Sequence, residues 1–329
     1  MIDLPVLSNP APACAAGAAS ASGRKPDWLR VRAPGGDSYT MIKKTLRERG
    51  LFTVCEEAHC PNVGECWGGG TATFMLLGEI CTRGCRFCAV STGDPGGRVD
   101  RDEPHKLAES VALMSLKYIV LTMVDRDDLE DGGAAHVAEC IRHLKRCDPD
   151  LIVESLVGDF AGDGAAIDTV VESQVDVYGH NIETVARLQR TVRDARCGYE
   201  QSLGALRRAK QHELAPYTKS SIMLGLGESH AEVTATMRDL REARVDFLTV
   251  GQYLQPTHRH LEVAEWIHPD RFEQLRVEGE AMGFGYVAAG PLVRSSYRAG
   301  EFFIESLVRQ RRECAASVMP GEAAWGASC

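Results

Sequence analysis

The residues with the clearest chemical potential in this chain are its cysteines. Twelve occur among 329 residues, and half of them lie between Cys55 and Cys88. The last three of these follow the spacing Cys81-x3-Cys85-x2-Cys88, which places three thiolates in one tight loop. Thiolates are the usual ligands of an iron–sulfur cube, and three of them leave one of its four irons open to a small molecule. Structural zinc requires a fourth ligand, which this spacing does not supply. The loop therefore predicts a [4Fe–4S] cluster with an open iron.

A second group of three cysteines, Cys55-x4-Cys60-x5-Cys66, lies just upstream. Taken alone, this group fits zinc as well as iron–sulfur, because zinc-binding loops occur with several spacings. Its position immediately before the other loop favours a second iron–sulfur cluster. This group also lacks a fourth thiolate nearby in the sequence.

The elements that must position these loops alternate regularly along the chain. Short apolar runs are separated by stretches whose apolar residues recur at helical spacing. The strand-like runs are Phe74–Ile80, Tyr118–Val124, Leu151–Val157, Val175–Tyr178, Ser221–Leu226 and Phe247–Val250. Strands that alternate with helices indicate βαβ units and a parallel sheet. Six such units predict an α/β fold, a partial (β/α)6 barrel of the TIM type. The first run leads directly into Cys81, so we expect the cluster loop at the carboxyl ends of the strands, where such barrels place their chemistry.

The remaining segments define the expected domain organisation. Residues 1–36 begin with an Ala-, Ser-, Pro- and Gly-rich stretch and predict a disordered leader. Residues 37–72 form an N-terminal extension that carries the Cys55 group, and residues 73–290 form the barrel. Residues 291–329 form a C-terminal segment with a helical tail.

Composition excludes several classes of protein. The chain has 37 basic and 46 acidic side chains and a formal net charge of −9, which argues against a broad nucleic-acid-binding face. Its apolar runs are much shorter than the roughly 18–20 residues that a membrane span needs. The N-terminus lacks the basic start and the apolar core of a secretory signal. We therefore expect a cytoplasmic protein that binds neither nucleic acid nor membrane, in which clustered cysteines hold metal more often than they bridge one another.

Both cysteine groups, together with three other segments, resemble a known family. Cys-x3-Cys-x2-Cys is the signature of the radical S-adenosylmethionine (SAM) enzymes, and the upstream group makes the chain similar to the lipoyl synthases in particular. The resemblance runs from about residue 37 to residue 298. Its landmarks are Thr53–Asn62, Cys81–Val90, Arg126–Gly133, Val250–Leu254 and Gly290–Tyr297. The last landmark contains Arg-Ser-Ser-Tyr, a tetrapeptide peculiar to this family.

The resemblance implies a reaction, two cofactors and a set of ligands. Lipoyl synthases insert two sulfur atoms at C6 and C8 of a protein-bound octanoyl group, which forms the lipoyl cofactor. In this family, cysteines at the positions of Cys81, Cys85 and Cys88 hold the [4Fe–4S] cluster that binds SAM and generates the radical. The resemblance assigns the auxiliary [4Fe–4S] cluster, which supplies the sulfur, to Cys55, Cys60, Cys66 and Ser296.

The resemblance also implies binding partners, and two alternative functions stay open beside it. The substrate would be an octanoylated lipoyl carrier domain, either in the E2 subunit of a 2-oxoacid dehydrogenase or in the H protein of glycine cleavage. The electron donor would be a ferredoxin or a flavodoxin. One alternative is another radical SAM enzyme that inserts sulfur or dehydrogenates. The other, from a different class, is a non-catalytic iron–sulfur electron carrier, which would not bind SAM.

Two polar residues, Asn181 and Glu183, follow the fourth predicted strand. Radical SAM barrels often hold the ribose of the cofactor at this place. The alternative is a polar loop in which Glu183 stabilises the first turn of a helix. The chain departs from the family pattern at Met123, Gly179, Ser221 and Glu262.

Six further cysteines lie outside the cluster loops, and two of them, Cys140 and Cys197, occupy positions that can be interpreted. Cys140 shares the apolar face of Val137 and Ile141, which predicts a small residue in the hydrophobic core. Cys197 precedes Gly198 in a predicted loop, and we expect no role for it.

Overall fold

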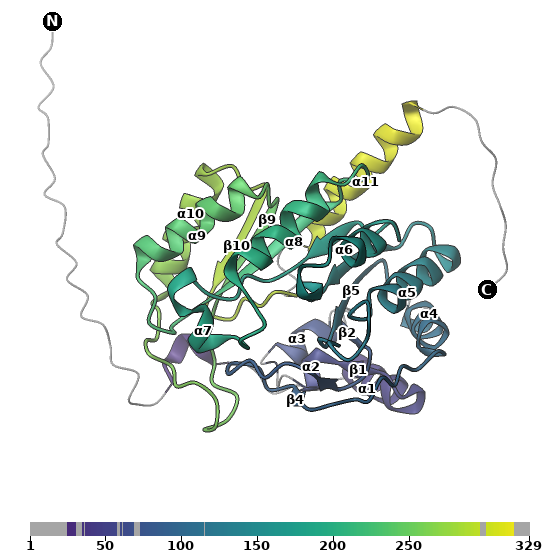
Figure 1. The fold of residues 1–329 in the computed structure, drawn as a ribbon, viewed down its shortest axis with the longest axis horizontal. Helices are drawn as coiled ribbons and strands as arrows, with labels where there is room; N and C mark the ends of the chain where they lie inside the picture. Colours follow the sequence, from purple (N-terminus) through teal and green to yellow (C-terminus); the bar gives the residue numbers. More distant parts are fainter. Residues whose placement is uncertain are drawn as a thin grey trace, which may run out of the picture.

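The computed structural model describes residues 25–30, 35, 37–57, 60, 62–68, 73–114, 116–296 and 301–318. Most of the expected leader, residues 1–36, lies outside the described residues. The N-terminal extension contains α1 (Asp37–Arg49), α2 (Val54–Glu57) and α3 (Val63–Gly68), with the short strand β1 (Phe52–Thr53) between the first two helices. These elements lie together beside the first strand of the main sheet (Figure 1).

One eight-stranded sheet forms the centre of the fold, with the strand order β1-β2-β5-β6-β7-β8-β9-β10. Its strands after β1 are β2 (Thr73–Leu76), β5 (Tyr118–Met123), β6 (Ile152–Leu156), β7 (Val177–Gly179), β8 (Tyr217–Leu224), β9 (Phe247–Gln252) and β10 (Tyr286–Gly290). Every neighbouring pair from β2 to β10 is parallel, whereas β1 pairs with β2 in the antiparallel direction. Because β1 and β10 are the two edges of this order, the sheet is an open, partial barrel. The predicted α/β fold is confirmed.

Helices connect the successive parallel strands and lie along the outer side of the sheet (Figure 1). They are α4 (Glu103–Met114), α5 (Ala134–Cys147), α6 (Gly164–Val171), α7 (Gln189–Val192), α8 (Tyr199–Gln211), α9 (His230–Glu242) and α10 (Pro269–Ala281). In α5 the predicted apolar face is buried, with Val137, Cys140 and Ile141 all fully shielded from solvent. The predicted core position of Cys140 is therefore confirmed.

The first barrel strand is shorter than the sequence predicts. It ends at Leu76, because Leu77 and Gly78 adopt left-handed backbone conformations with φ of 68° and 91°. The chain resumes as a separate two-residue strand, β3 (Ile80–Cys81), which pairs with β4 (Ser91–Thr92). Cys81 thus belongs to a separate two-stranded ladder that follows the carboxyl end of β2, not to the barrel strand itself.

The C-terminal helix α11 (Glu301–Val318) closes the amino end of the barrel, opposite the cysteine loop. Its Ile304 and Val308 form one hydrophobic cluster with Tyr118 and Ile152, the first residues of β5 and β6. Apolar side chains of α11 therefore cover the amino ends of these strands. Among the described residues, no helix combines the length and apolar composition that a membrane crossing requires.

Candidate active site and cluster loops

A cavity of about 520 Å³ opens at the carboxyl ends of the parallel strands. The cysteines of the second group, Cys81, Cys85 and Cys88, all line it. The loops after β5, β6, β7 and β9 supply much of the remaining wall. The structure therefore brings the three predicted thiols together at the end of the barrel where the sequence places them.

A buried arginine inside the cysteine loop anchors it to the barrel. The Arg83 guanidinium lies 2.7 Å from a carboxylate oxygen of Asp127 and 2.7 Å from one of Asp159. Asp127 follows β5 and Asp159 follows β6, so Arg83 joins the loop to two neighbouring strand ends. Removing one partner of such a buried pair leaves an uncompensated charge, which makes the anchor costly to break.

Without a metal the thiols of this loop are protonated, whereas its backbone donors suit metal-bound sulfur. Burial, together with the carboxylate of Asp125, raises the pKa of the Cys81 thiol to about 11. Backbone N–H groups donate to two of the sulfurs, from Arg83 to Cys81 Sγ at 3.4 Å and from Asp194 to Cys85 Sγ at 3.3 Å. Metal binding replaces thiol protons, and hydrogen bonds to sulfur tune the potential of an iron–sulfur cluster. Three thiols on one cavity, with donors aimed at sulfur, fit a [4Fe–4S] cluster.

The first cysteine group lies against the C-terminal segment. Cys60 and Ser296 both line the cavity that the second group lines. The side-chain amide of Asn62 donates to the carbonyl of Leu292 at 2.6 Å, so the N-terminal extension and the C-terminal segment are in direct contact here. The N–H of Cys60 donates to the carbonyl of Cys55 at 3.1 Å, which keeps these two cysteines adjacent.

Burial also dominates the thiols of this first group. It raises the pKa of Cys55 to about 11, with a further contribution from Cys60. It raises the pKa of Cys60 as well, against the opposing effect of the nearby Arg294 guanidinium. Cys66 belongs to α3, but its side chain lies outside the described residues. The described part of the group thus provides a buried thiol, Cys55, and a half-buried thiol, Cys60, which shares the cavity wall with Ser296.

Asn181 and Glu183 line the same cavity beyond the end of β7. The Asn181 amide donates to the Glu183 carboxylate at 3.1 Å, and burial raises the pKa of Glu183. Glu183 forms an isolated bridge with Ile222 of β8 instead of beginning a helix. Its backbone has a φ of 67°, a conformation that non-glycine residues rarely adopt and that often marks a functional position. These features favour the cofactor-binding interpretation over the helix-stabilising one.

Cys197, for which the sequence analysis expected no role, lies in the cavity wall. This buried thiol is in hydrogen-bonding contact with Cys85, and Arg83 Nη1 lies 3.5 Å from its sulfur. It stands alone in the sequence, without a neighbouring cysteine at ligand spacing. Only the path of the loop between α7 and α8 brings it to the cluster loop.

His180, after β7, is a second residue that the sequence analysis missed. Burial lowers its pKa to about 4, so its ring is neutral at pH 7. One ring nitrogen, Nδ1, donates to the carbonyl of Val157 at 2.8 Å, and the other accepts from the Ser202 hydroxyl at 2.9 Å. That hydroxyl accepts in turn from Arg193 at 2.7 Å. His180 therefore helps to hold a cationic side chain, Arg193, in the cavity wall.

Comparisons with known proteins agree with this geometry. Residues 75–240 match the model of the radical SAM superfamily, and residues 17–60 match that of the N-terminal domain of lipoyl synthase of the radical SAM family. A lipoyl synthase from Ectopseudomonas mendocina is 57% identical over 279 residues, which cover 85% of this chain and 80% of the relative. A mitochondrial lipoyl synthase from Danio rerio is 52% identical, over 88% of this chain and 74% of the relative. The chain belongs to the lipoyl synthase family.

Membership of the lipoyl synthase family makes the chain a radical SAM enzyme that transfers sulfur. The family uses SAM and iron–sulfur chemistry, so the alternative of a non-catalytic electron carrier is excluded.

Solved structures support the fold alone. Methylornithine synthase has a TM-score of 0.51 at 14% identity and covers 84% of this chain and 88% of its own. A maturase of the [FeFe]-hydrogenase has a TM-score of 0.52 at 13% identity, over 77% of this chain and 56% of its own.

The four departures from the lipoyl synthase pattern differ in their relation to the site. Met123 and Ser221 line the cavity. Gly179 has room for a small side chain, because a Cβ there would meet its nearest neighbours in Leu156 and Ser155 at an ordinary 3.4 Å. Glu262 is exposed to solvent. Only the first two can touch a molecule bound in the cavity.

Proposed function

We propose that the chain inserts two sulfur atoms at C6 and C8 of a protein-bound octanoyl group, using two [4Fe–4S] clusters. One cluster, held by Cys81, Cys85 and Cys88, generates the radical from SAM. The auxiliary cluster supplies the sulfur and takes its ligands from Cys55, Cys60, Cys66 and Ser296. One observation carries this proposal: Cys60 and Ser296, from opposite ends of the chain, line the cavity that the second cysteine group lines.

A shared cavity is what this reaction requires. The carbon from which hydrogen is removed must be the carbon that receives sulfur, so one bound substrate has to reach both groups. When bound, the clusters and SAM supply the radical chemistry, because no protein side chain can break an unactivated C–H bond by acid–base catalysis. The chain itself positions the reactants and excludes water. Apolar side chains of α11 cover the amino ends of the strands, and the cavity lies at their carboxyl ends.

Individual side chains have distinct roles in this proposal. Asn181 and Glu183 hold SAM through their amide and carboxylate, since both lie on the cavity and Glu183 is rigidly held beside β8. Arg83 keeps the radical-generating loop in place through Asp127 and Asp159. Ser296 offers the auxiliary cluster an oxygen, which is a harder ligand than thiolate and would release its iron more readily when sulfur is consumed.

The same reasoning extends to the domain organisation and the partners. Residues 37–72 and 291–329 act together as the module for the auxiliary cluster, and residues 73–290 act as the radical-generating barrel. The Asn62–Leu292 hydrogen bond supports this pairing of the two ends. The substrate is an octanoylated carrier domain of an E2 subunit or an H protein, and a ferredoxin or flavodoxin donates electrons.

Anaerobic turnover of an octanoyl-lysine carrier peptide should yield a product with two added sulfur atoms, as measured by mass spectrometry. The protein used should hold about eight iron and eight sulfide ions per chain, as two cubes require. A reconstituted chain with about four irons, with zinc held by the Cys55 group and no sulfur in the product, would contradict the proposal. The mass of the peptide thus tests the reaction, and the metal count tests the second cluster.

Gly251→Ala should displace the segment that carries Ser296. Gly251 lies in β9, and a Cβ added there would be 2.1 Å from the carbonyl oxygen of Val293. Because this neighbour is backbone, the segment must move, at a cost of about 1–3 kcal/mol of unfolding free energy. We expect a lower thermal midpoint and a loss of sulfur insertion. The matched control is Gly204→Ala in α8, where a Cβ meets nothing within 4 Å. Equal sulfur insertion by both variants would contradict the role of this segment.

A further inference from the structure

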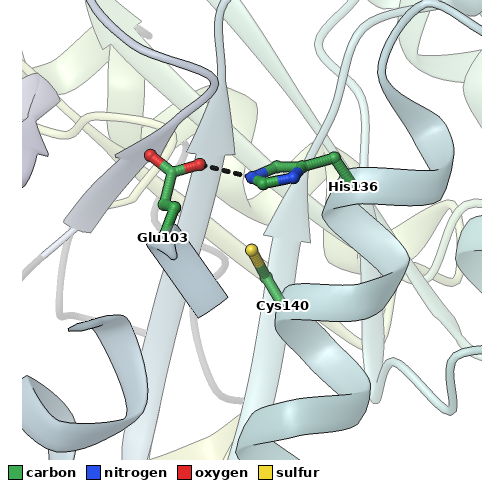
Figure 2. A group of neighbouring side chains, drawn as sticks. All are labelled: Glu103, His136 and Cys140. Atoms are coloured by element: carbon green, nitrogen blue, oxygen red, sulfur yellow. Dashed lines mark hydrogen bonds and ion pairs between the residues drawn. The ribbon is translucent and has the colours of Figure 1, made fainter. Parts of the chain in front are cut away.

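A second group of metal-binding side chains lies outside the cavity, between α4 and α5. It consists of Glu103, His136 and Cys140 (Figure 2). The carboxylate oxygen, ring nitrogen and sulfur that these residues offer all lie within 4.8 Å of one another. Oxygen, nitrogen and sulfur from these three residue types are all ligands of zinc in proteins.

Two neighbouring helices build this group. His136 and Cys140 are four residues apart on α5, the spacing at which one helical face presents two ligands to a single metal ion. Glu103 is the first residue of α4, the helix that packs beside α5. Figure 2 shows the Cys140 sulfur directed toward the space beside the Glu103–His136 contact. Because all three residues lie on helices, the backbone holds them at nearly fixed positions.

The charges of the group also favour a divalent cation. Glu103 and Cys140 are buried, and the His136 side chain is only 13% exposed. The Glu103 carboxylate accepts from the N–H of Leu77 at 3.0 Å and lies 2.6 Å from His136 Nε2. A Zn²⁺ ion held by a carboxylate, a thiolate and a neutral imidazole has no net charge, so a buried site accommodates it without an unpaired charge. The proton of the Cys140 thiol passes to solvent when the metal binds.

We propose that Glu103, His136 and Cys140 bind one Zn²⁺ ion, with water as the fourth ligand. Sites with nitrogen and sulfur ligands bind Zn²⁺ more tightly than Fe²⁺. The bound ion would fasten α4 to α5. It would also steady Leu77, the left-handed residue where the chain leaves β2 toward the cluster loop. The inference does not depend on the assignment of either iron–sulfur cluster.

X-ray absorption at the zinc edge tests this site in the holoenzyme, because the iron clusters do not contribute to the zinc edge. The holoenzyme is incubated with zinc sulfate and freed of unbound metal. We expect one zinc per chain beside an undiminished iron content, with one sulfur ligand at about 2.3 Å and nitrogen or oxygen ligands at about 2.0–2.2 Å. No retained zinc, zinc with only nitrogen and oxygen ligands, or zinc with three sulfur ligands would overturn the proposal. The last result would place the ion in a cluster loop and count against the auxiliary cluster instead.

Variants identify the ligands in the same measurement. Cys140→Ala should remove the sulfur scattering, and His136→Ala should weaken zinc binding by at least about 10–100-fold, the usual loss even for residues that only support a ligand. Glu139→Gln and His143→Ala are matched controls, because both residues lie on α5 and contact Arg146 on the exposed face. They should bind zinc as the parent does. Equal zinc affinity in His136→Ala and the two controls would overturn the assignment.

Discussion

Cys88→Ala is expected to abolish the formation of 5′-deoxyadenosine from SAM while leaving the auxiliary cluster assembled. Only Cys81 and Cys85 would remain in the loop, and two thiolates cannot hold a cube that keeps one iron open for SAM. The rate should fall by at least about 10³-fold, as it does when an essential catalytic group is removed. The measurement is chromatographic detection of 5′-deoxyadenosine under anaerobic, reducing conditions. The iron content should fall by about half, to the four irons of one cube.

The control for this variant is Cys314→Ala. Cys314 is an exposed thiol on α11, at the end of the barrel opposite the cavity. Its removal should leave both the iron content and the rate of 5′-deoxyadenosine formation unchanged. If Cys88→Ala also formed 5′-deoxyadenosine at the parent rate, the assignment of this loop to the radical-generating cluster would be wrong.

Replacing Cys55, Cys60 and Cys66 together by alanine should separate the two activities. The variant loses the proposed sulfur source but keeps the second cysteine loop, whose anchor runs through Arg83 to the barrel. We therefore expect 5′-deoxyadenosine formation to persist while no sulfur-containing product is made. Mass spectrometry of the carrier peptide and chromatography of the nucleoside, on the same sample, measure both outcomes.

Ser296→Ala should shift the two activities in the same direction, through a much smaller change. The hydroxyl is lost from the cavity wall, and with it the oxygen that we propose as a ligand of the auxiliary cluster. Sulfur insertion should slow or fail while radical formation continues. Since Cys60 and Ser296 come from opposite ends of the chain, a shared effect would join them functionally as well as spatially.

A different result would favour a structural role for the N-terminal loop. If that loop only held zinc and braced the barrel, the triple variant should unfold or lose both activities together. A soluble triple variant that still inserts sulfur would disprove the sulfur-donor proposal. The thermal midpoint of each variant, measured beside the parent, separates loss of structure from loss of chemistry.

The features that the sequence predicts well are local. The ligand spacing of Cys81, Cys85 and Cys88 lies within eight consecutive residues, so the chemistry of the loop follows from residue types and short distances. Strands such as Tyr118–Met123 are nearly continuous apolar runs, because a parallel sheet covered on both faces buries most of its side chains. The boundary at Leu76 was missed, since a left-handed leucine leaves no signal in hydrophobic periodicity.

Other features depend on how segments far apart in the chain pack together. From the residues alone, Ser296 is an ordinary polar residue in a turn, and only the family resemblance points to it. The fold places it on the cavity with Cys60. β10 is the last strand in the order, and the segment that follows it contacts the N-terminal extension through the Asn62–Leu292 hydrogen bond. Composition and spacing contain no information about this contact.

By itself, the sequence determined the α/β barrel, the two cysteine groups and the family, because periodicity and ligand spacing are properties of short segments. Tertiary structure alone decided which buried groups surround those segments. It brought Cys197 to Cys85, paired Arg83 with Asp159, and set Glu103 beside His136. Each of these pairs joins separate elements, and their proximity depends on strand order and helix packing. Those long-range interactions arise only when the whole chain buries its apolar surface around one sheet.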